Sequence, residues 1–263
     1  MSDFVMTHWP VTRFTETETE TTTLVIAEET PVSFVFNSVP YAVMMASLQD
    51  LEDYAYGFSI TERLVSHPSS IKAVRTEIGE DGVTLFLDIA GEDFRRLLQS
   101  RRAMTGRTGC GVCGSEDLKS LHTALPTVPA MPPIPLAAIR HAVNTLAGHQ
   151  TLNAQVHMVH GAAWCAADGN LRMIREDVGR HNALDKLIGA GLRQNICFSE
   201  GFCLITSRCS FEMVQKAILA GFSTLVAISA PTTRALRLAE QAGLTIVALA
   251  RRSSQSLFTG TVG

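Results

Sequence analysis

Residues 202–250 read FCLITSRCSFEMVQKAILAGFSTLVAISAPTTRALRLAEQAGLTIVALA, and this stretch decides the fold class. Apolar residues recur at helical spacing over Phe211–Leu219, and a second helical segment opens at Pro231 and closes before Gly243. These two segments separate three apolar runs of strand length, at Phe202–Thr206, Thr224–Ser229 and Leu244–Ala250. Strands that are apolar on both faces and alternate with helices indicate a largely parallel sheet covered by helices. The stretch therefore predicts an α/β fold.

The alternation of strands and helices extends toward the N-terminus as far as residue 154. Ala154–Val159 and Leu171–Ile174 are predicted strands, and Ala183–Gly191 is a predicted helix. Upstream of them, the proline-rich residues 126–135 indicate a stiff connector, and such connectors commonly separate domains. We therefore expect an α/β domain over residues 126–263 and a smaller α+β part over residues 1–125.

The N-terminal part is predicted to contain two β-hairpins and a helix. Thr23–Ala27 and Val32–Phe36 are rich in residues that favour strands, and we expect them to pair with each other. Ile71–Ile78 and Val83–Ile89 flank an Asp-Gly pair, which favours a tight turn between two strands. Between the two hairpins, the apolar residues of Ala42–Phe58 recur at helical spacing, which predicts a helix.

The composition narrows the class of protein. The chain has 263 residues, of which 46% are hydrophobic, and this is enough to bury a substantial core. Its net charge of −3 gives no overall electrostatic footprint for nucleic acid or for an anionic membrane surface. Its apolar runs are too short to span a membrane, and its first ten residues lack the pattern of a signal peptide. The six cysteines are therefore expected to be reduced thiols of a cytoplasmic protein.

Cys110 and Cys113 form a C-x-x-C pair within residues 106–114, GRTGCGVCG. On spacing alone, such a pair most often supplies half of a zinc site. The second half is missing, because no other cysteines have this spacing and His157 and His160 are not expected on one face of their predicted strand. A redox disulfide is also disfavoured, since no helix is predicted to begin at the pair.

Sulfur transfer fits this pair better than zinc binding or redox chemistry does. Four glycines and the lack of a helical pattern predict a flexible, exposed loop, which suits a group that has to visit two partners. A thiolate can take the outer sulfur of a donor persulfide, and a second thiol can release that sulfur by attacking the inner sulfur atom. The remaining cysteines are expected to be buried small hydrophobic residues; they are Cys165, Cys197, Cys203 and Cys209.

Three polar clusters follow predicted strands, at residues 176–182, 206–210 and 249–254. Open α/β sheets bind ligands at such junctions, and helix N-termini there attract anions. Helix capping by Asp177 or Asn182 is an alternative explanation of the first cluster. Together the clusters predict a pocket for an anionic, nucleotide-like ligand, with Arg208 suited to bind a phosphate. Deaminase chemistry is not expected, because the His-x-Glu or Cys-x-Glu that it requires does not occur.

Four segments resemble the FdhD family, the formate dehydrogenase accessory sulfurtransferases. They are residues 41–53 (YAVMMASLQDLED), 108–114 (TGCGVCG), 176–186 (EDVGRHNALDK) and 206–216 (TSRCSFEMVQK). The resemblance implies a cytidine-deaminase-like C-terminal domain with three α/β/α layers, and a homodimer. It also implies that the protein receives sulfur from a cysteine desulfurase and passes it to the bis-molybdopterin guanine dinucleotide cofactor before insertion into apo formate dehydrogenase.

The resemblance also implies roles for individual residues. The persulfide-bearing cysteine of the family maps onto Cys110, with Cys113 as its partner, and the cofactor segment of the family maps onto the end of the last predicted strand. We expect the cofactor to be transient cargo and no metal to be bound permanently. A chaperone that moves no sulfur and a metal-structural module remain as alternatives. The expected cofactor-binding residues are His181, Arg208, Leu249, Ala250, Arg251, Arg252, Ser253 and Ser254.

Overall fold

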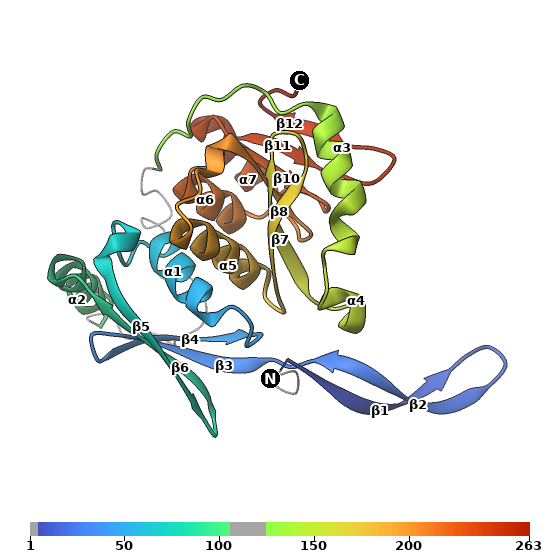
Figure 1. Cartoon of the computed structure of the whole chain (residues 1–263), viewed down its shortest axis with the longest axis horizontal. Coiled ribbons are helices and arrows are strands. Elements are labelled where there is room, and N and C mark those ends of the chain that lie inside the picture. The colour runs from blue at the N-terminus through green and yellow to red at the C-terminus, as the bar shows by residue number, and fades with distance from the viewer. Residues whose placement is uncertain (1–4, 106–124) are drawn as a thin grey trace.

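The computed structural model describes residues 5–105 and 125–263 (Figure 1). Within these residues the strands form three sheets, of two, four and six strands. Residues 125–263 supply the six-stranded sheet, and residues 5–105 supply the other two. The predicted α/β class is confirmed, and the six-stranded sheet carries the three polar clusters.

The six-stranded sheet has the order β12-β11-β10-β9-β7-β8. Strands β9, β10 and β11 run parallel, whereas β7 is antiparallel to both of its neighbours and β12 is antiparallel to β11. The sheet is therefore mixed, and only its centre has the parallel arrangement that the sequence predicts. The strands are β7 (His160–Ala166), β8 (Leu171–Asp177), β9 (Gly201–Ile205), β10 (Thr224–Ala227), β11 (Thr245–Ala248) and β12 (Ser256–Thr259).

Helices cover both faces of this sheet (Figure 1). Along β9, Cys203 and Ile205 pack into the core under α5, α6 and α7, while Phe202 and Leu204 pack into the core under α3. Alternate residues of one strand thus enter different cores, which explains why the strand is apolar on both faces. The result is a three-layer arrangement. The helices are α3 (Leu136–Thr145), α4 (Asn153–Val156), α5 (Arg180–Arg193), α6 (Phe211–Ala220) and α7 (Thr233–Ala242), with short 3-10 turns at Leu146–Gly148 and Phe198–Glu200.

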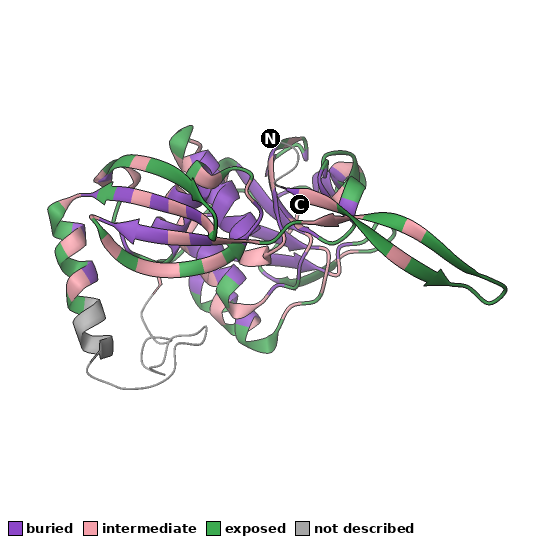
Figure 2. Cartoon of the chain, turned by 90° about the horizontal axis from the view of Figure 1, so that it is seen from below, coloured by how far each residue is buried: buried purple, intermediate pink, exposed green. Residues whose placement is uncertain are grey.

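The N-terminal residues form a four-stranded sheet, β4-β3-β6-β5, whose apolar face packs against α1. The separate β1–β2 hairpin projects away from the rest of the molecule (Figures 1 and 2). Most of this hairpin is exposed, as Figure 2 shows by its colour. The elements are β1 (Met6–Phe14), β2 (Thr19–Ala27), β3 (Thr30–Phe36), β4 (Val39–Ala46), α1 (Leu51–Thr61), β5 (Ile71–Gly79), β6 (Gly82–Ile89) and α2 (Gly91–Thr105), with a short 3-10 turn at Pro68–Ser70.

One of the two predicted N-terminal hairpins is confirmed. Strands β5 and β6 pair antiparallel, and Gly82 at the turn has a φ of 137°, which favours glycine. The hairpin predicted from Thr23–Ala27 and Val32–Phe36 is wrong. Both segments are strands, but β2 pairs with β1, and β3 pairs with β4 and β6. Each strand instead forms a hairpin with its other neighbour along the chain, β2 with β1 and β3 with β4, and the strand pattern alone does not indicate which neighbour is chosen.

Two segments differ in secondary structure from what the sequence predicts, over part of their length. Ala42–Ala46, the first part of the predicted helix Ala42–Phe58, belongs to the edge strand β4, and the helix begins only at Leu51. The predicted strand Ala154–Val159 is wrong, because α4 occupies Asn153–Val156. The buried carboxylate of Glu176 accepts hydrogen bonds from the backbone N–H groups that begin this turn. A tertiary contact therefore favours helix there over strand.

Helices α1 and α5 cross in close contact because each has a glycine at the crossing, Gly57 in α1 and Gly189 in α5. A Cβ atom on Gly57 would overlap the backbone carbonyl of Asp185, and one on Gly189 would overlap that of Asp53. Helix backbones can approach this closely only where side chains are missing at the crossing. The crossing brings the N-terminal part directly against the helix of the EDVGRHNALDK segment.

Gly189→Ala is expected to destabilise the protein, because the added methyl group has to push α1 and α5 apart. The expected loss in the free energy of unfolding is about 1–3 kcal/mol or more, as for other overpacked interiors. Urea denaturation followed by circular dichroism measures it. Gly148→Ala is the matched control, since nothing lies within 4 Å of a Cβ at that position. Equal stability of the two variants would contradict a tight crossing.

Candidate functional site

The three polar clusters lie along one edge of the six-stranded sheet. Strands β8, β9 and β11 run in the same direction, so their carboxyl ends reach the same edge, and the amino end of the antiparallel β7 lies there too. The strand order places residues 176–182 and 206–210 on either side of β7, whereas residues 249–254 lie beyond β10. At about 4.8 Å per strand, the first and third clusters are roughly 19 Å apart. This end of the sheet, called the carboxyl edge below, therefore has two separate regions and does not form one compact pocket.

The carboxylate of Asp177 lies in a fully buried polar network and does not face solvent. It accepts hydrogen bonds from the backbone N–H of Ser47 (3.1 Å) and of Gly179 (2.8 Å), and Lys186 Nζ lies 2.6 Å away. Burial lowers the pKa of Lys186, although the attraction of Asp177 opposes this. Asp177 thus joins the start of α5 to the connection between β4 and α1.

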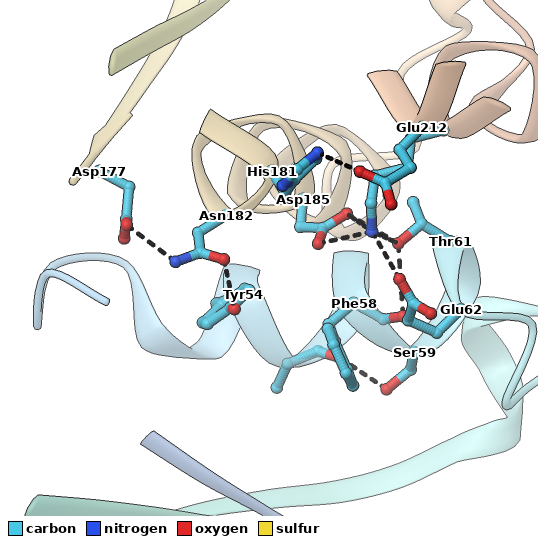
Figure 3. A network of polar contacts seen from close by, with 12 residues as sticks. Tyr54, Phe58, Ser59, Thr61, Glu62, Asp177, His181, Asn182, Asp185 and Glu212 are labelled. Carbon is cyan, nitrogen blue, oxygen red and sulfur yellow. Dashed lines mark hydrogen bonds and ion pairs between the residues drawn. The ribbon is translucent and has the colours of Figure 1, made fainter. Parts of the chain in front are cut away.

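Asn182 extends the same network (Figure 3). Its side-chain amide donates to Asp177 and to the backbone carbonyl of Met45 (2.8 Å), and its Oδ1 accepts from the Tyr54 hydroxyl (2.7 Å). Neither Asp177 nor Asn182 supplies a side-chain cap to α5. The buried polar residues of EDVGRHNALDK therefore fasten the two parts of the chain together, and capping does not explain this segment.

Lys216, in the segment of residues 206–216, forms a second buried link, and its partners Thr61, Glu62 and Asp185 are labelled in Figure 3. Its Nζ lies 2.9 Å from Asp185 Oδ2, from Glu62 Oε1 and from Thr61 Oγ1. Burial alone would lower the pKa of Lys216, but the attraction of the two carboxylates outweighs it and raises the pKa. Burial raises the pKa of Asp185. Charges from α1, α5 and α6 thus meet in one place inside the molecule.

His181 and Glu212 bridge the first turns of α5 and α6, with 2.7 Å between His181 Nε2 and Glu212 Oε2 (Figure 3). The hydrogen bond from His181 lowers the pKa of Glu212. Half-buried His160, at the start of β7, has a pKa lowered by burial and by the nearby charges of Arg180, His181 and Arg208. The predicted residues His181 and Arg208 therefore lie in one positively charged region, together with His160 and Arg180.

Arg180 lies in the first predicted polar cluster, residues 176–182, whereas the sequence does not indicate that His160 belongs to this region. From the sequence, His160 is a candidate only for a zinc site, because the predicted strand Ala154–Val159 ends just before it. The true strand begins at His160 and runs antiparallel to its neighbours, which brings its first residue to the carboxyl edge. Recognition of residues 160–166 as the strand would have placed it there.

The segment that follows β11 presents mostly exposed polar groups. Arg251, Arg252, Ser253 and Ser254 are exposed, and the backbone N–H of Arg251 donates to the carbonyl of Ser254 (2.8 Å). Leu249 has a φ of 51°, the left-handed conformation that is unusual for this residue type. Ala250 is fully buried in the core under α3, and its backbone N–H donates to the carbonyl of Ala227, so no part of this predicted cofactor-binding residue is exposed.

Cys110 and Cys113 lie outside the described residues. Of the cysteines that the structure describes, Cys165, Cys203 and Cys209 are buried, as predicted, but Cys197 is exposed. Burial raises the pKa of Cys165 and of Cys209 to about 12 and that of Cys203 well above its usual value. Because the thiolate is the nucleophile, these three thiols are poorly suited to sulfur chemistry at neutral pH.

We expect one fast-reacting thiol per native chain in a Cys110→Ser/Cys113→Ser variant. Cys197 should react with Ellman's reagent, whereas Cys165, Cys203 and Cys209 should react only after unfolding, because they are buried and protonated. Absorbance of the released thiolate measures the number of reacting groups. Adding Cys197→Ser should remove the fast reaction, and fast labelling of a second thiol in the native protein would contradict these burial assignments.

Residues 5–105 and 125–263 contain neither a metal cluster nor a membrane-spanning helix. No group of three or more His, Cys, Asp or Glu residues is arranged to hold a metal ion there, and none of the helices described is long and apolar enough to cross a bilayer. An open hollow of about 360 Å³ lies beside the β5–β6 turn, lined by Glu28, Glu29, Glu80 and Asp81 among others. This acidic hollow belongs to the N-terminal sheets and is not part of the carboxyl edge.

Comparison with known proteins identifies the family. The family model of the FdhD/NarQ family matches residues 27–262. The chain belongs to this family. It is 47% identical over 226 residues to a protein of Xanthomonas euvesicatoria named sulfur carrier protein FdhD, with 86% of this chain and 80% of the relative covered. A Bordetella petrii protein of the same name is 43% identical, with 89% of this chain and 84% of the relative covered.

One solved structure has the same fold as this FdhD/NarQ family member. It is a crystal structure of a protein from Desulfotalea psychrophila assigned as a formate dehydrogenase accessory protein, with a TM-score of 0.77 and 21% sequence identity. The likeness covers 97% of each chain. The three-layer arrangement with a smaller N-terminal part is therefore found in another chain of quite different sequence.

Proposed function

We propose that this chain carries sulfur for the maturation of formate dehydrogenase. The observation that carries the proposal is the match to the FdhD/NarQ family over residues 27–262, with close relatives named as sulfur carriers. The burial of three of the four described cysteines supports it, since it leaves the C-x-x-C pair and Cys197 as the thiols available for chemistry.

In the proposed mechanism, Cys110 holds the sulfur as a persulfide. Its thiolate attacks the outer sulfur of a persulfide on a cysteine desulfurase, a new S–S bond forms, and the desulfurase cysteine leaves as a thiolate. Cys113 then assists release by attacking the inner sulfur of Cys110, which frees the outer sulfur as sulfide and leaves a disulfide. A cellular thiol reductant has to restore the pair before the next cycle. The chain thus acts as a sulfurtransferase.

The sulfur acceptor in this proposal is the bis-molybdopterin guanine dinucleotide cofactor, bound as cargo before its insertion into apo formate dehydrogenase. Two features of the carboxyl edge support this. His181 and Arg208 lie in its positively charged region, and the exposed arginines and serines of residues 249–254 provide further donors for phosphate oxygens. The cytoplasmic location, the homodimer and the domain boundary near residue 125 belong to the same proposal.

Mass spectrometry tests the sulfur step directly. After incubation with a cysteine desulfurase and cysteine, the peptide that contains Cys110 is expected to gain the mass of one sulfur atom, and a reducing agent should remove it. The Cys197 peptide of the same sample is the internal control for unspecific persulfide formation. No gain on Cys110 would favour the alternative function, a chaperone that binds the cofactor or the apoenzyme without moving sulfur.

A further inference from the structure

The β1–β2 hairpin has an apolar face that the rest of the chain leaves uncovered. Trp9 and Leu24 lie opposite each other on the two strands and are 61% and 39% exposed. The other face of the hairpin packs at its base against α4, through Met6 and Val25. Because an isolated two-stranded hairpin is at best marginally stable in water, its exposed apolar face indicates a surface that is covered in the assembled protein.

The four-stranded sheet also has an uncovered face, called the outer face below. Along the edge strand β4, Ala42 and Met44 pack into the core against α1, whereas Val43 and Met45 point the other way and are 64% and 44% exposed. Half-buried Phe86 of β6 lies on the same face by its register. Figure 2, in which the molecule is seen from below, shows the strands of this sheet in front of the helices.

The two uncovered faces cannot cover each other within one chain. The hairpin leads into β3 but projects away from the four-stranded sheet (Figures 1 and 2). A second copy related by a two-fold axis has the same two faces, so each hairpin can lie on the sheet of the other copy. Such an exchange forms two identical contacts and leaves neither apolar face exposed.

The area of these contacts agrees with that of a stable dimer. Each strand of the hairpin has nine residues. At about 3.4 Å per residue and about 4.8 Å between strands, one face of the hairpin covers about 300 Å². Two hairpins and the sheet surfaces beneath them would bury about 1,200 Å², the lower end of the range for stable interfaces. A second copy is present wherever the chain is made, so it can cover the faces permanently.

We propose that the hairpin of each copy packs its Trp9–Leu24 face onto the outer face of the four-stranded sheet of a second copy. The contact is a sheet-on-sheet packing of two apolar surfaces. The family match begins at residue 27, so it does not include the hairpin. The inference rests on the proposed function only for the homodimer, and it assigns the elements that hold the two copies together.

Trp9→Asp and Val43→Asp test the two sides of the contact. Sedimentation equilibrium of the purified full chain measures the dissociation constant of the dimer. We expect each variant to dimerise at least tenfold more weakly, because a carboxylate would be buried in an apolar contact without a partner. Both residues are exposed in the single chain, so the unfolding temperature of the monomer should not change. Phe14→Asp is the matched control and should dimerise normally, since Phe14 is 76% exposed on the opposite face of the hairpin.

A mixture of the two variants tests whether the contact is reciprocal. In a mixed pair, the intact hairpin of the Val43→Asp copy meets the intact sheet of the Trp9→Asp copy, so one of the two contacts is restored. The mixture should therefore contain more dimer than either variant alone at the same total concentration, and a mixture without this gain overturns the exchange. A dimer that neither substitution weakens overturns the contact but not the homodimer, whereas a monomeric unsubstituted chain overturns both.

Discussion

Cys110→Ser is expected to reduce the formate dehydrogenase activity of host cells to the background of cells that lack this chain. Serine keeps the size of the side chain but cannot hold a transferable sulfur atom, so the relay stops at its first step. The measurement is formate oxidation by extracts of a deletion strain complemented with each variant. Cys113→Ser should lower the activity less, because in the proposed mechanism it assists only in release.

Two controls make this result interpretable. Cys197→Ser removes the exposed thiol among the described cysteines and should leave the activity unchanged. The circular dichroism spectrum and unfolding temperature of Cys110→Ser should match those of the unsubstituted chain. Full activity of a correctly folded Cys110→Ser variant would refute the relay and would leave the chaperone as the function to test.

Lys216→Met is expected to lower the free energy of unfolding by about 3–5 kcal/mol, as is typical when one member of a buried ion pair is removed. The Asp185 side chain is 2% exposed and would keep only the Thr61 hydroxyl as a hydrogen-bond donor (2.7 Å) among the contacts described. Urea denaturation monitored by tryptophan fluorescence measures the loss. If the free energy of unfolding falls by less than on loss of an exposed ion pair, the Asp185 carboxylate has become hydrated or has found another partner.

The loss in Lys216→Met should also depend on pH. Burial raises the pKa of Asp185 in the folded state, and without Lys216 the pKa should rise further. Stability from a group with a raised folded-state pKa is present at low pH and is lost as the pH rises. The deficit should therefore grow between about pH 4, the usual pKa of an aspartate, and the higher folded-state value. Unfolding curves at pH 5 and pH 8 test the sign.

Two controls separate the buried pair from a general effect of charge. The double variant Lys216→Met/Asp185→Leu should recover most of the lost stability, because it leaves no uncompensated charge of the pair. Arg13→Gln removes one member of the Arg13–Glu20 pair, whose side chains are 52% and 45% exposed. Its expected effect is at most about 1 kcal/mol.

The sequence predicted the fold best where local pattern and tertiary environment agree. Strands β9, β10 and β11 are buried on both faces, so they appear as unbroken apolar runs, and proline and glycine mark the limits of the helix between β10 and β11. Prediction failed where a distant contact decides. Strand β4 is an edge strand whose apolar residues also fit a helical spacing, and α4 depends on the buried carboxylate of Glu176.

The candidate site was predictable from chain order but not from residue type alone. Clusters that follow parallel strands have to reach one edge, and His181 and Arg208 do lie there together. The burial of Asp177, Asn182 and Lys186 could not be predicted, because polar residues usually lie on the solvent-exposed surface.

The contact between α1 and α5 determines whether the two parts of this chain can fold as separate fragments. Lys186 and Lys216 are fully or almost fully buried, and their partners Ser47, Thr61 and Glu62 all come from the first 62 residues. A fragment that begins at residue 126 would therefore keep both ammonium groups but lose these oxygens and the apolar cover of α1. Expressed separately, such halves should aggregate, and the intact chain should melt in a single cooperative transition.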